Sequence, residues 1–353
     1  MPALSPQDSV NSPEHLPELV HNLRHNSSVL ALAVSPKHGC IFAGTQDGEI
    51  VTWSLATFHQ VRRIQAHKGS VLSLSLSPDE SLLFSSAGDP LINVWCPKSL
   101  RRTCEIYSTY DVGDVFCTAY SQQHNILYIG AQNASIQWLS LKEYSDPSMP
   151  DPKKHPDKRN HRFFDSKPIG GSSTPRRSED RWNSIPQAQK LCEIPSAAVR
   201  NFSHYGYVYC MLMAKGPTVE VGSEDDVLIS GSGDGTIKLW RLNTNTQTDE
   251  VISTRGAITE IMTLGTDDAD SVLSLAIDGS FLYSGKLDGM VELWDLDTAQ
   301  KLRVIKAHEH DIWALQMSAG HLWVASSNGS VAVSETQLHG ASGTSFALCA
   351  LAE

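Results

Sequence analysis

Apolar and polar residues alternate with a period of two over many short stretches of this chain. Stretches such as SSVLALAVSPKHGCIFAG, GSVLSLSLSPDESLLFSS and DSVLSLAIDGSFLYSG each contain two such segments around a polar turn. Successive side chains of a β-strand point to opposite faces, so this alternation predicts short strands rather than helices. The pattern therefore predicts an all-β protein.

Six copies of a second pattern lie along the chain. Each copy has a polar turn with an Asp or Asn and then an apolar segment, which in most copies reaches a Trp. The copies are TQDGEIVTW (45–53), SAGDPLINVW (86–95), AQNASIQWL (131–139), SGSGDGTIKLW (230–240), GKLDGMVELW (285–294) and SSNGSVAVS (326–334). Apart from one long step after the third copy, they recur every 40 to 54 residues. Such a period is typical of a repeat architecture.

The glycine-rich turn of SGSGDGTIKLW is also of a kind that binds phosphate. A phosphate loop leads into a helix, however, and IKLW alternates like a strand. We therefore interpret this stretch as a hairpin turn in which the glycine after the Asp permits a positive φ.

A His precedes the first apolar residue of a predicted strand by four residues in four of the repeats. These are His25, His67, His204 and His308, and Asp111 and Asp268 hold the place in the other two. A period of about 40 residues, four short strands and a terminal Trp together resemble the WD-repeat β-propeller family over roughly residues 19 to 351. The resemblance implies a propeller with six recognisable repeats and the start of a seventh.

In that family a His, a Ser or Thr, an Asp and a Trp form a hydrogen-bonded structural tetrad in each blade, which satisfies the buried Asp. Two repeats here have the full set: His67, Ser85, Asp89 and Trp95, and His204, Ser230, Asp234 and Trp240. A third set, Asp268, Ser284, Asp288 and Trp294, has Asp in place of His. The first repeat has His25, Asp47 and Trp53, but Ala43 replaces the hydroxyl residue. The third repeat has Trp138 one place early, and the last keeps His308 and Asn328 with Ser334 at the Trp position.

The domain organisation follows from the repeats. Residues 1–18 form a predicted flexible tail, and residues 19–353 form the predicted propeller. An insert at 142–188 has seven prolines and no apolar periodicity, which predicts a disordered loop in the third blade. We expect the loop to lie between the third strand of that blade and a fourth strand near QKLCEIP. Within it, Phe163 and Phe164 are either an apolar pair that folds back on the propeller or an anchor for a partner.

Both ends of the propeller are irregular. The stretch GTSFALCALAE resembles the first strand of a seventh blade, and LVHNLRH (19–25) resembles an outermost strand. A propeller commonly closes through its N-terminal strand, which removes exposed edges. The expectation is a last blade that lacks its middle, in a chain cut from a longer protein. The alternative is a six-bladed ring with a short tail.

The net charge and the cysteine content limit the classes of partner and site that we expect. The chain carries a formal net charge of −11, which does not suit nucleic acid or an anionic membrane surface. Its seven cysteines include no C-x-x-C pair, so neither a disulfide framework nor a structural zinc site is expected. With no signal-peptide pattern and no apolar run that spans a membrane, we expect a cytoplasmic protein.

No constellation of catalytic residues stands out. The stretch HEHD (308–311) has some likeness to a zinc-binding motif, but its first His occupies the repeat position and downstream ligands are missing. There is no G-x-S-x-G for an exposed nucleophile. We therefore expect no catalytic residue, no metal and no cofactor in this chain, and a non-catalytic role.

Four further stretches fall outside the general repeat. They are YSTYDVGDVFCTAY (107–120), IGAQNASIQWL (129–139), HRFFDS (161–166) and HYGYVYCM (204–211). Together they resemble the N-terminal propeller of the large subunit of the fungal glutathione-degrading complex. The resemblance implies a cytosolic assembly with a glutamine-amidotransferase-like partner, which opens the γ-glutamyl bond of glutathione. It also implies a di-zinc peptidase domain whose metal ligands would all lie beyond Glu353.

Two other interpretations stay open. The chain is a general WD-repeat adaptor, of the ubiquitin-ligase or trafficking type, if the repeats indicate its function and the four further stretches do not. It is an enzyme in its own right if it binds zinc or hydrolyses dipeptides or γ-glutamyl bonds.

Overall fold

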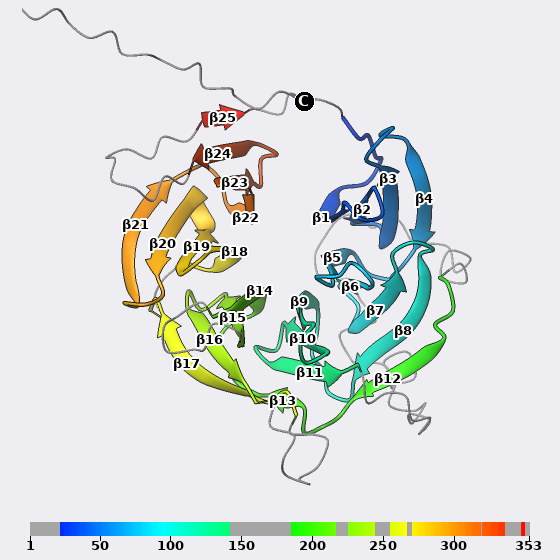
Figure 1. Cartoon of the computed structure of the whole chain (residues 1–353), viewed down its shortest axis with the longest axis horizontal. Coiled ribbons are helices and arrows are strands. Elements are labelled where there is room, and N and C mark those ends of the chain that lie inside the picture. The colour runs from blue at the N-terminus through cyan, green and yellow to red at the C-terminus, as the bar shows by residue number, and fades with distance from the viewer. Residues whose placement is uncertain are drawn as a thin grey trace, which may run out of the picture.

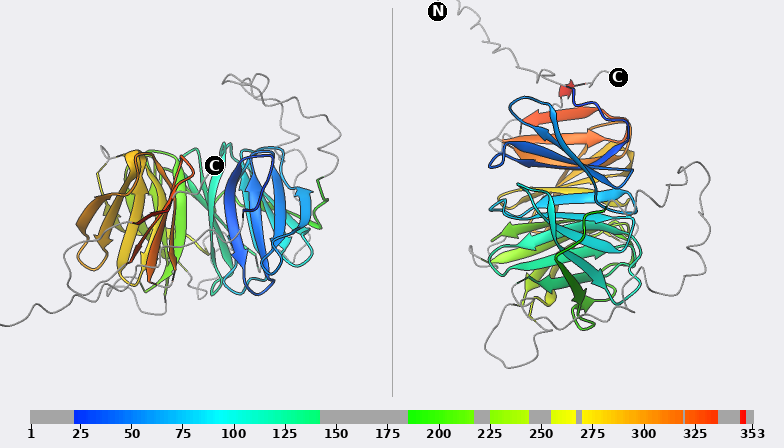
Figure 2. Two further views of the ribbon diagram at one scale, coloured as in Figure 1. Left: turned by 90° about the horizontal axis from the view of Figure 1, so that it is seen from above. Right: turned by 90° about the vertical axis from the view of Figure 1, so that its right-hand side faces the viewer.

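Short antiparallel strands follow one another along nearly all of the chain that the computed structural model describes, which is residues 22–141, 185–216, 225–243, 255–266, 270–318, 320–335 and 347–349. One turn of 3-10 helix, η3 (Leu287–Gly289), is the only helix in these ranges. The strands form six sheets arranged around a central axis (Figure 1). Seen from the side, the sheets stand next to one another as the blades of a propeller (Figure 2).

Each blade has four antiparallel strands in chain order, with the first strand nearest the axis (Figure 1), and blade two has one additional outer strand. Blade one has β1 (Val29–Ser35), β2 (Cys40–Thr45), β3 (Glu49–Ser54) and β4 (Gln60–Gln65). Blade two has β5 (Val71–Leu76), β6 (Leu83–Ala87), β7 (Leu91–Cys96) and β8 (Arg101–Ser108). Blade three has β9 (Val115–Ser121), β10 (Ile126–Ala131), β11 (Ile136–Ser140) and β13 (Val199–Arg200).

The other three blades follow the same order. Blade four has β14 (Val208–Lys215), β15 (Asp226–Ser232), β16 (Ile237–Leu242) and β17 (Ile258–Leu264). Blade five has β18 (Val272–Asp278), β19 (Phe281–Lys286), β20 (Met290–Asp295) and β21 (Gln300–Lys306). Blade six has β22 (Ile312–Ser318), β23 (His321–Ser326), β24 (Val331–Glu335) and β25 (Ala347–Cys349). The all-β fold expected from the alternation and the propeller implied by the family resemblance are both confirmed, and the propeller has six blades.

Glycines in the second strands let neighbouring blades approach closely. A Cβ on Gly44 of β2 would lie 2.5 Å from Cγ1 of Val71, the first residue of the next blade. Gly231 of β15 has the same relation to Val272, again at 2.5 Å. The β-branched side chain fills the space that the glycine leaves, so the core lies between the sheets.

The strand predicted near QKLCEIP belongs to another blade than expected. This strand, β12 (Lys190–Ile194), runs parallel to β8 as a fifth strand on the outer edge of blade two, and β13 is the fourth strand of blade three. There Cys192 is buried, and its sulfur lies 2.7 Å from that of Cys104 on β8. The expectation was wrong because alternation identifies a strand but not which free edge it pairs with.

The expected start of a seventh blade is also corrected. Residues 347–349 of the stretch GTSFALCALAE form β25, which pairs with β24 as the outer strand of blade six. Inner and outer strands have the same alternation, and the free edge of β24 decides the pairing. Of the expected outermost strand at 19–25, residues 22–25 form no strand, and 19–21 lie outside the described residues.

Candidate functional site

Two blades hold complete tetrads. In blade two, the Ser85 hydroxyl accepts a 2.8 Å hydrogen bond from Trp95 Nε1 and lies 2.8 Å from His67 Nε2. The other ring nitrogen, His67 Nδ1, lies 3.0 Å from Asp89 Oδ1. A carboxylate only accepts, so His67 Nδ1 donates to Asp89, and Nε2 then accepts the proton of Ser85.

Blade four repeats this chain of contacts. The Ser230 hydroxyl accepts from Trp240 Nε1 at 2.8 Å and lies 2.7 Å from His204 Nε2, while His204 Nδ1 lies 3.3 Å from Asp234 Oδ2. Both Asp234 oxygens accept further bonds, from the backbone N–H groups of Tyr205 and Thr236. Burial opposes the ionised form, but these bonds and the His204 ring outweigh it and hold the pKa of Asp234 well below its usual range.

The remaining tetrads are partial. In blade five, Trp294 Nε1 donates to the Ser284 hydroxyl at 3.3 Å, Asp288 has a φ of 55°, and Asp268 lies outside the described residues. In blade three, Trp138 Nε1 is buried and has no hydrogen-bond partner among the described residues.

Blade six also keeps only part of its tetrad. His308 Nε2 donates to the Val324 carbonyl at 3.0 Å. The hydroxyl of Ser330 lies 3.0 Å from His308 Nδ1 and donates to Asn328.

Blade one shows what the missing hydroxyl changes. The His25 ring meets Trp53 edge to face, with 6.2 Å between ring centroids, and Ala43 stands where blades two, four and five have Ser. His25 Nε2 is buried and has no hydrogen-bond partner among the described residues. Asp47 accepts a bond from Gln65 through its backbone carbonyl. The tetrad groups are thus committed to holding turns in place, which is a structural role.

The blade-four tetrad also positions an exposed aromatic loop. His204 is tied to Ser230 and Asp234, and it leads directly into Tyr205, whose side chain is 83% exposed. Phe202 in the same loop is also 83% exposed and has a φ of 53°, a conformation that is costly for a bulky residue. Exposed aromatic side chains on a rigidly held loop are typical of protein-binding surfaces.

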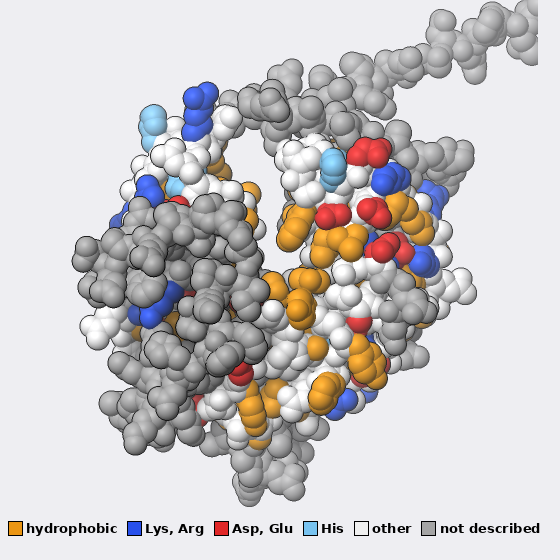
Figure 3. Space-filling model, turned by 180° about the vertical axis from the view of Figure 1, so that it is seen from behind, with side chains coloured by type: hydrophobic (Ala, Val, Ile, Leu, Met, Phe, Trp, Pro, Cys, Tyr) orange, Lys and Arg blue, Asp and Glu red, His pale blue; other side chains and the backbone are white. Residues whose placement is uncertain are grey.

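An aromatic cluster continues from this loop to the neighbouring blade. Phe116 of β9 stacks on Tyr207 with a centroid distance of 5.9 Å and meets Tyr209 of β14 at a tilted angle of 59° with a centroid distance of 5.1 Å. The loop and this cluster, Phe202, Tyr205, Tyr207, Tyr209 and Phe116, are called the aromatic surface below. It unites the stretches 107–120 and 204–211, which stand 80 residues or more apart in the sequence. Hydrophobic side chains border the central opening of the ring on the face shown in Figure 3.

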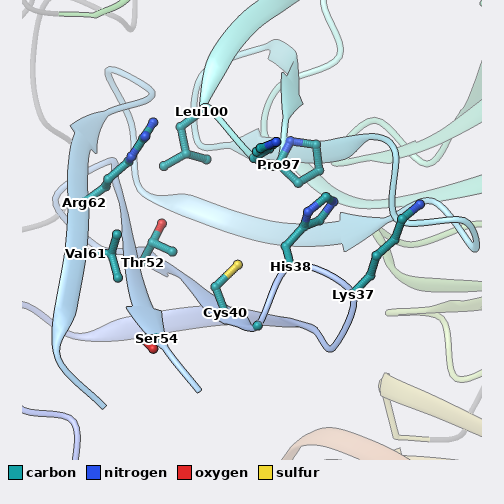
Figure 4. Close-up of a pocket in the computed structure, with 11 residues that line it drawn as sticks. Lys37, His38, Cys40, Thr52, Ser54, Val61, Arg62, Pro97 and Leu100 are labelled. Atoms are coloured by element: carbon teal, nitrogen blue, oxygen red, sulfur yellow. The ribbon is translucent and has the colours of Figure 1, made fainter. Parts of the chain in front are cut away.

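A pocket of about 610 Å³ lies on another part of the ring, between blades one and two (Figure 4). Lys37, Arg62 and Lys98 line it, and no acidic residue does so among the described residues. Burial and the nearby Glu80 carboxylate raise the pKa of its Cys40 thiol, which favours the unreactive protonated form. Three cations alone do not make a site, and the ring of His38, which also lines the pocket, is hydrogen-bonded to the Glu80 carbonyl and not to the Cys40 thiol.

The other candidate sites are of three kinds: a metal centre, a membrane-spanning helix and the phenylalanine pair of the insert. The described residues contain no group of three or more His, Cys, Asp or Glu side chains placed to bind a metal ion. No helix in the described ranges is long and apolar enough to cross a membrane. The candidate partner-binding residues Phe163 and Phe164 lie outside the described residues.

Comparison with known proteins agrees with the repeats. The model of the family "WD domain, G-beta repeat" matches residues 17–54, 58–96, 198–241 and 259–295. A crystal structure of the computationally designed Ika8 protein superposes with a TM-score of 0.52 at 19% identity, covering 90% of this chain and 73% of that chain. At that identity the likeness concerns the fold alone.

Curated relatives are similar over different lengths. "Probable di- and tripeptidase DUG2" of Saccharomyces cerevisiae is 29% identical over 350 residues, which is 88% of this chain and 38% of that protein. "Autophagy-related protein 16" of Arabidopsis thaliana is 29% identical over 91 residues, 26% of this chain and 15% of that protein. "Mitochondrial division protein 1" of Chaetomium globosum is 31% identical over 110 residues, 28% of this chain and 17% of that protein.

The chain thus spans well under two thirds of the length of each of these relatives. The WD40 repeats that the family model matches in this chain imply a protein-interaction scaffold. Such propeller domains are generally non-catalytic. The repeats, the six sheets and the tetrads lead to one conclusion: the chain is an all-β propeller of six blades that carries WD40 repeats.

Proposed function

We propose that this chain is the interaction and assembly module of a cytoplasmic glutathione-degrading complex, and that it is not itself catalytic. The aromatic surface is the observation that carries the proposal, because it is built from stretches that set this chain apart from a general WD repeat. Tyr205 and Phe202 expose most of their side chains there, on a loop that buried hydrogen bonds hold in place.

The likeness to "Probable di- and tripeptidase DUG2" over 88% of the chain supports the choice of complex. In the family that the chain resembles, a di-zinc peptidase domain follows the propeller. The peptidase and its metal ligands would then lie beyond Glu353, and the propeller would contribute binding rather than hydrolysis. We propose a glutamine-amidotransferase-like subunit as the protein partner, and no nucleic acid or membrane partner.

Affinity capture from cell extract tests the proposal. With the 353-residue chain as bait, we expect an amidotransferase-like protein among the captured proteins. Tyr205→Lys should reduce its recovery about tenfold, because aromatic side chains at the centre of an interface carry much of the binding energy. Val61→Lys is the matched control, because Val61 is also exposed but lies on β4 of blade one.

The same capture experiment distinguishes the proposed function from the alternative, a general adaptor role. Other WD40 relatives have names that point elsewhere, such as "Autophagy-related protein 16". Capture of ubiquitin-ligase or trafficking components, with equal recovery by Tyr205→Lys, would replace the proposal with a general adaptor role.

A further inference from the structure

Five junctions between successive blades share one packing arrangement. The first residue of each inner strand has a side chain that is fully buried, with an exposed fraction of 0%, against the blade before it. These residues are Val71, Val115, Val208, Val272 and Ile312. The arrangement therefore requires a blade on the preceding side.

Blade one departs from this arrangement. Val29 holds the same register position in β1 as Val71 in β5, yet it is 42% exposed. Leu32 is 63% exposed, whereas Leu74, its equivalent in blade two, is 8% exposed. The face of blade one that corresponds to a buried interface elsewhere is therefore uncovered.

Blade six is uncovered on the opposite face. Trp323 of β23 is 36% exposed, whereas its equivalents Phe42, Phe84, Tyr128, Ile229 and Tyr283 are buried. In blade two this position faces the next blade, because Phe84 packs on Tyr120 with a centroid distance of 5.1 Å. Both faces border the sector that separates blades six and one in Figure 1.

We infer that this sector, bordered by Val29, Leu32, Val34 and Trp323, binds one further four-stranded β-blade from polypeptide outside these 353 residues. The packing arrangement predicts which residue types that blade has at its two contact positions. It presents a β-branched residue to Ala325, which holds the register position of Gly44 in blade six. It presents a glycine or another small residue to Val29, as Gly44 does to Val71.

A four-stranded blade is longer than any stretch outside the described residues that adjoins blade one or blade six in the sequence. Blade five, from Val272 to Lys306, needs 35 residues. The stretches outside the described residues that adjoin blades one and six in the sequence are 1–21, 336–346 and 350–353, and each is shorter. The longer stretch at 142–184 follows Leu141 of blade three, on the other side of the ring, and shows no apolar alternation.

The test supplies a blade and asks whether the sector takes it up. A copy of residues 270–306 is fused after Glu353, because blade five contains both a suitable Val272 and a suitable Gly285. We expect the thermal midpoint to rise by about 3 °C or more and the binding of an apolar dye to fall. The matched control is the same fusion in which the copied Val272 is replaced by Lys, and it should show neither effect.

Two point variants keep the inference falsifiable if the fusion does not fold. In the unfused chain, Leu32→Lys should leave the midpoint unchanged, whereas Leu74→Lys at the equivalent buried position should lower it strongly. If Leu32→Lys is as damaging as Leu74→Lys, blade six closes directly on blade one and the inference is wrong. If the unfused chain is a dimer that Leu32→Lys dissociates, a second copy occupies the sector and the inference is again wrong.

Discussion

The Ser85 hydroxyl satisfies two buried ring nitrogens at once, His67 Nε2 and Trp95 Nε1. Ser85→Ala would leave both without a partner, at a cost of about 3 kcal/mol in the free energy of unfolding. Ser284→Ala is the matched variant in blade five, where the hydroxyl accepts a longer 3.3 Å bond from Trp294, so we expect about 1 kcal/mol. Urea unfolding of both variants gives the comparison. Equal losses would show that the His contact adds nothing.

Asp234 gives the fold a dependence on pH. Its pKa is lower in the folded chain than in the unfolded chain, so its contribution to stability is complete above the ordinary Asp pKa of about 3.9. That contribution is lost as the pH falls through the folded value. Asp234→Asn should therefore lower the thermal midpoint at pH 7, and the difference from the wild type should shrink below about pH 4. Asp270→Asn, at an exposed position, serves as the control and should change little at either pH.

A constant difference for Asp234→Asn from pH 7 to pH 3 would contradict this explanation. It would mean that the charge of Asp234 makes no contribution to stability. The loss would then come from the poor fit of the Asn side chain at this position.

At the scale of elements, the close approach of neighbouring blades depends on glycine in the second strand. A Cβ at Gly231 would lie 2.5 Å from Val272 Cγ1 and 2.7 Å from Cys210 Sγ. Gly231→Ala should therefore lower the free energy of unfolding by about 1–3 kcal/mol, as overpacked cores do. Adding Val272→Ala should recover part of the loss in a double-mutant cycle.

Gly88 provides the control for this prediction. A Cβ there would have its nearest neighbour 3.8 Å away, so Gly88→Ala should change stability by less than about 0.5 kcal/mol. Equal effects of Gly231→Ala and Gly88→Ala would show that backbone freedom, and not the blade contact, explains the glycines.

The sequence predicts the elements much better than their partners. Alternation and period identify the strands and the six repeats, and the His, Ser and Trp positions of two blades lie together as the repeat implies. The same alternation does not say that 190–194 pairs with β8 or that 347–349 pairs with β24, because any free strand edge accepts such a segment. Nor does it join Phe116 to Tyr207, whose contact depends on how blades three and four meet.

At the scale of the whole molecule, an open ring should not be equally stable throughout. Blades two to five each have a blade on both sides, whereas blades one and six have one neighbour and the uncovered residues Val29 and Trp323. In repeat architectures, stability is approximately a sum of unit and nearest-neighbour contributions, so terminal units open more easily. Native-state hydrogen exchange should therefore be fastest in β1–β4 and β22–β24 and slowest in blades three and four. Ser85→Ala should add fast exchange in blade two without changing blade five. Uniform protection across all six blades would mean that the ring is closed and unfolds as one unit, which would contradict both the open sector and the blade that we expect it to bind.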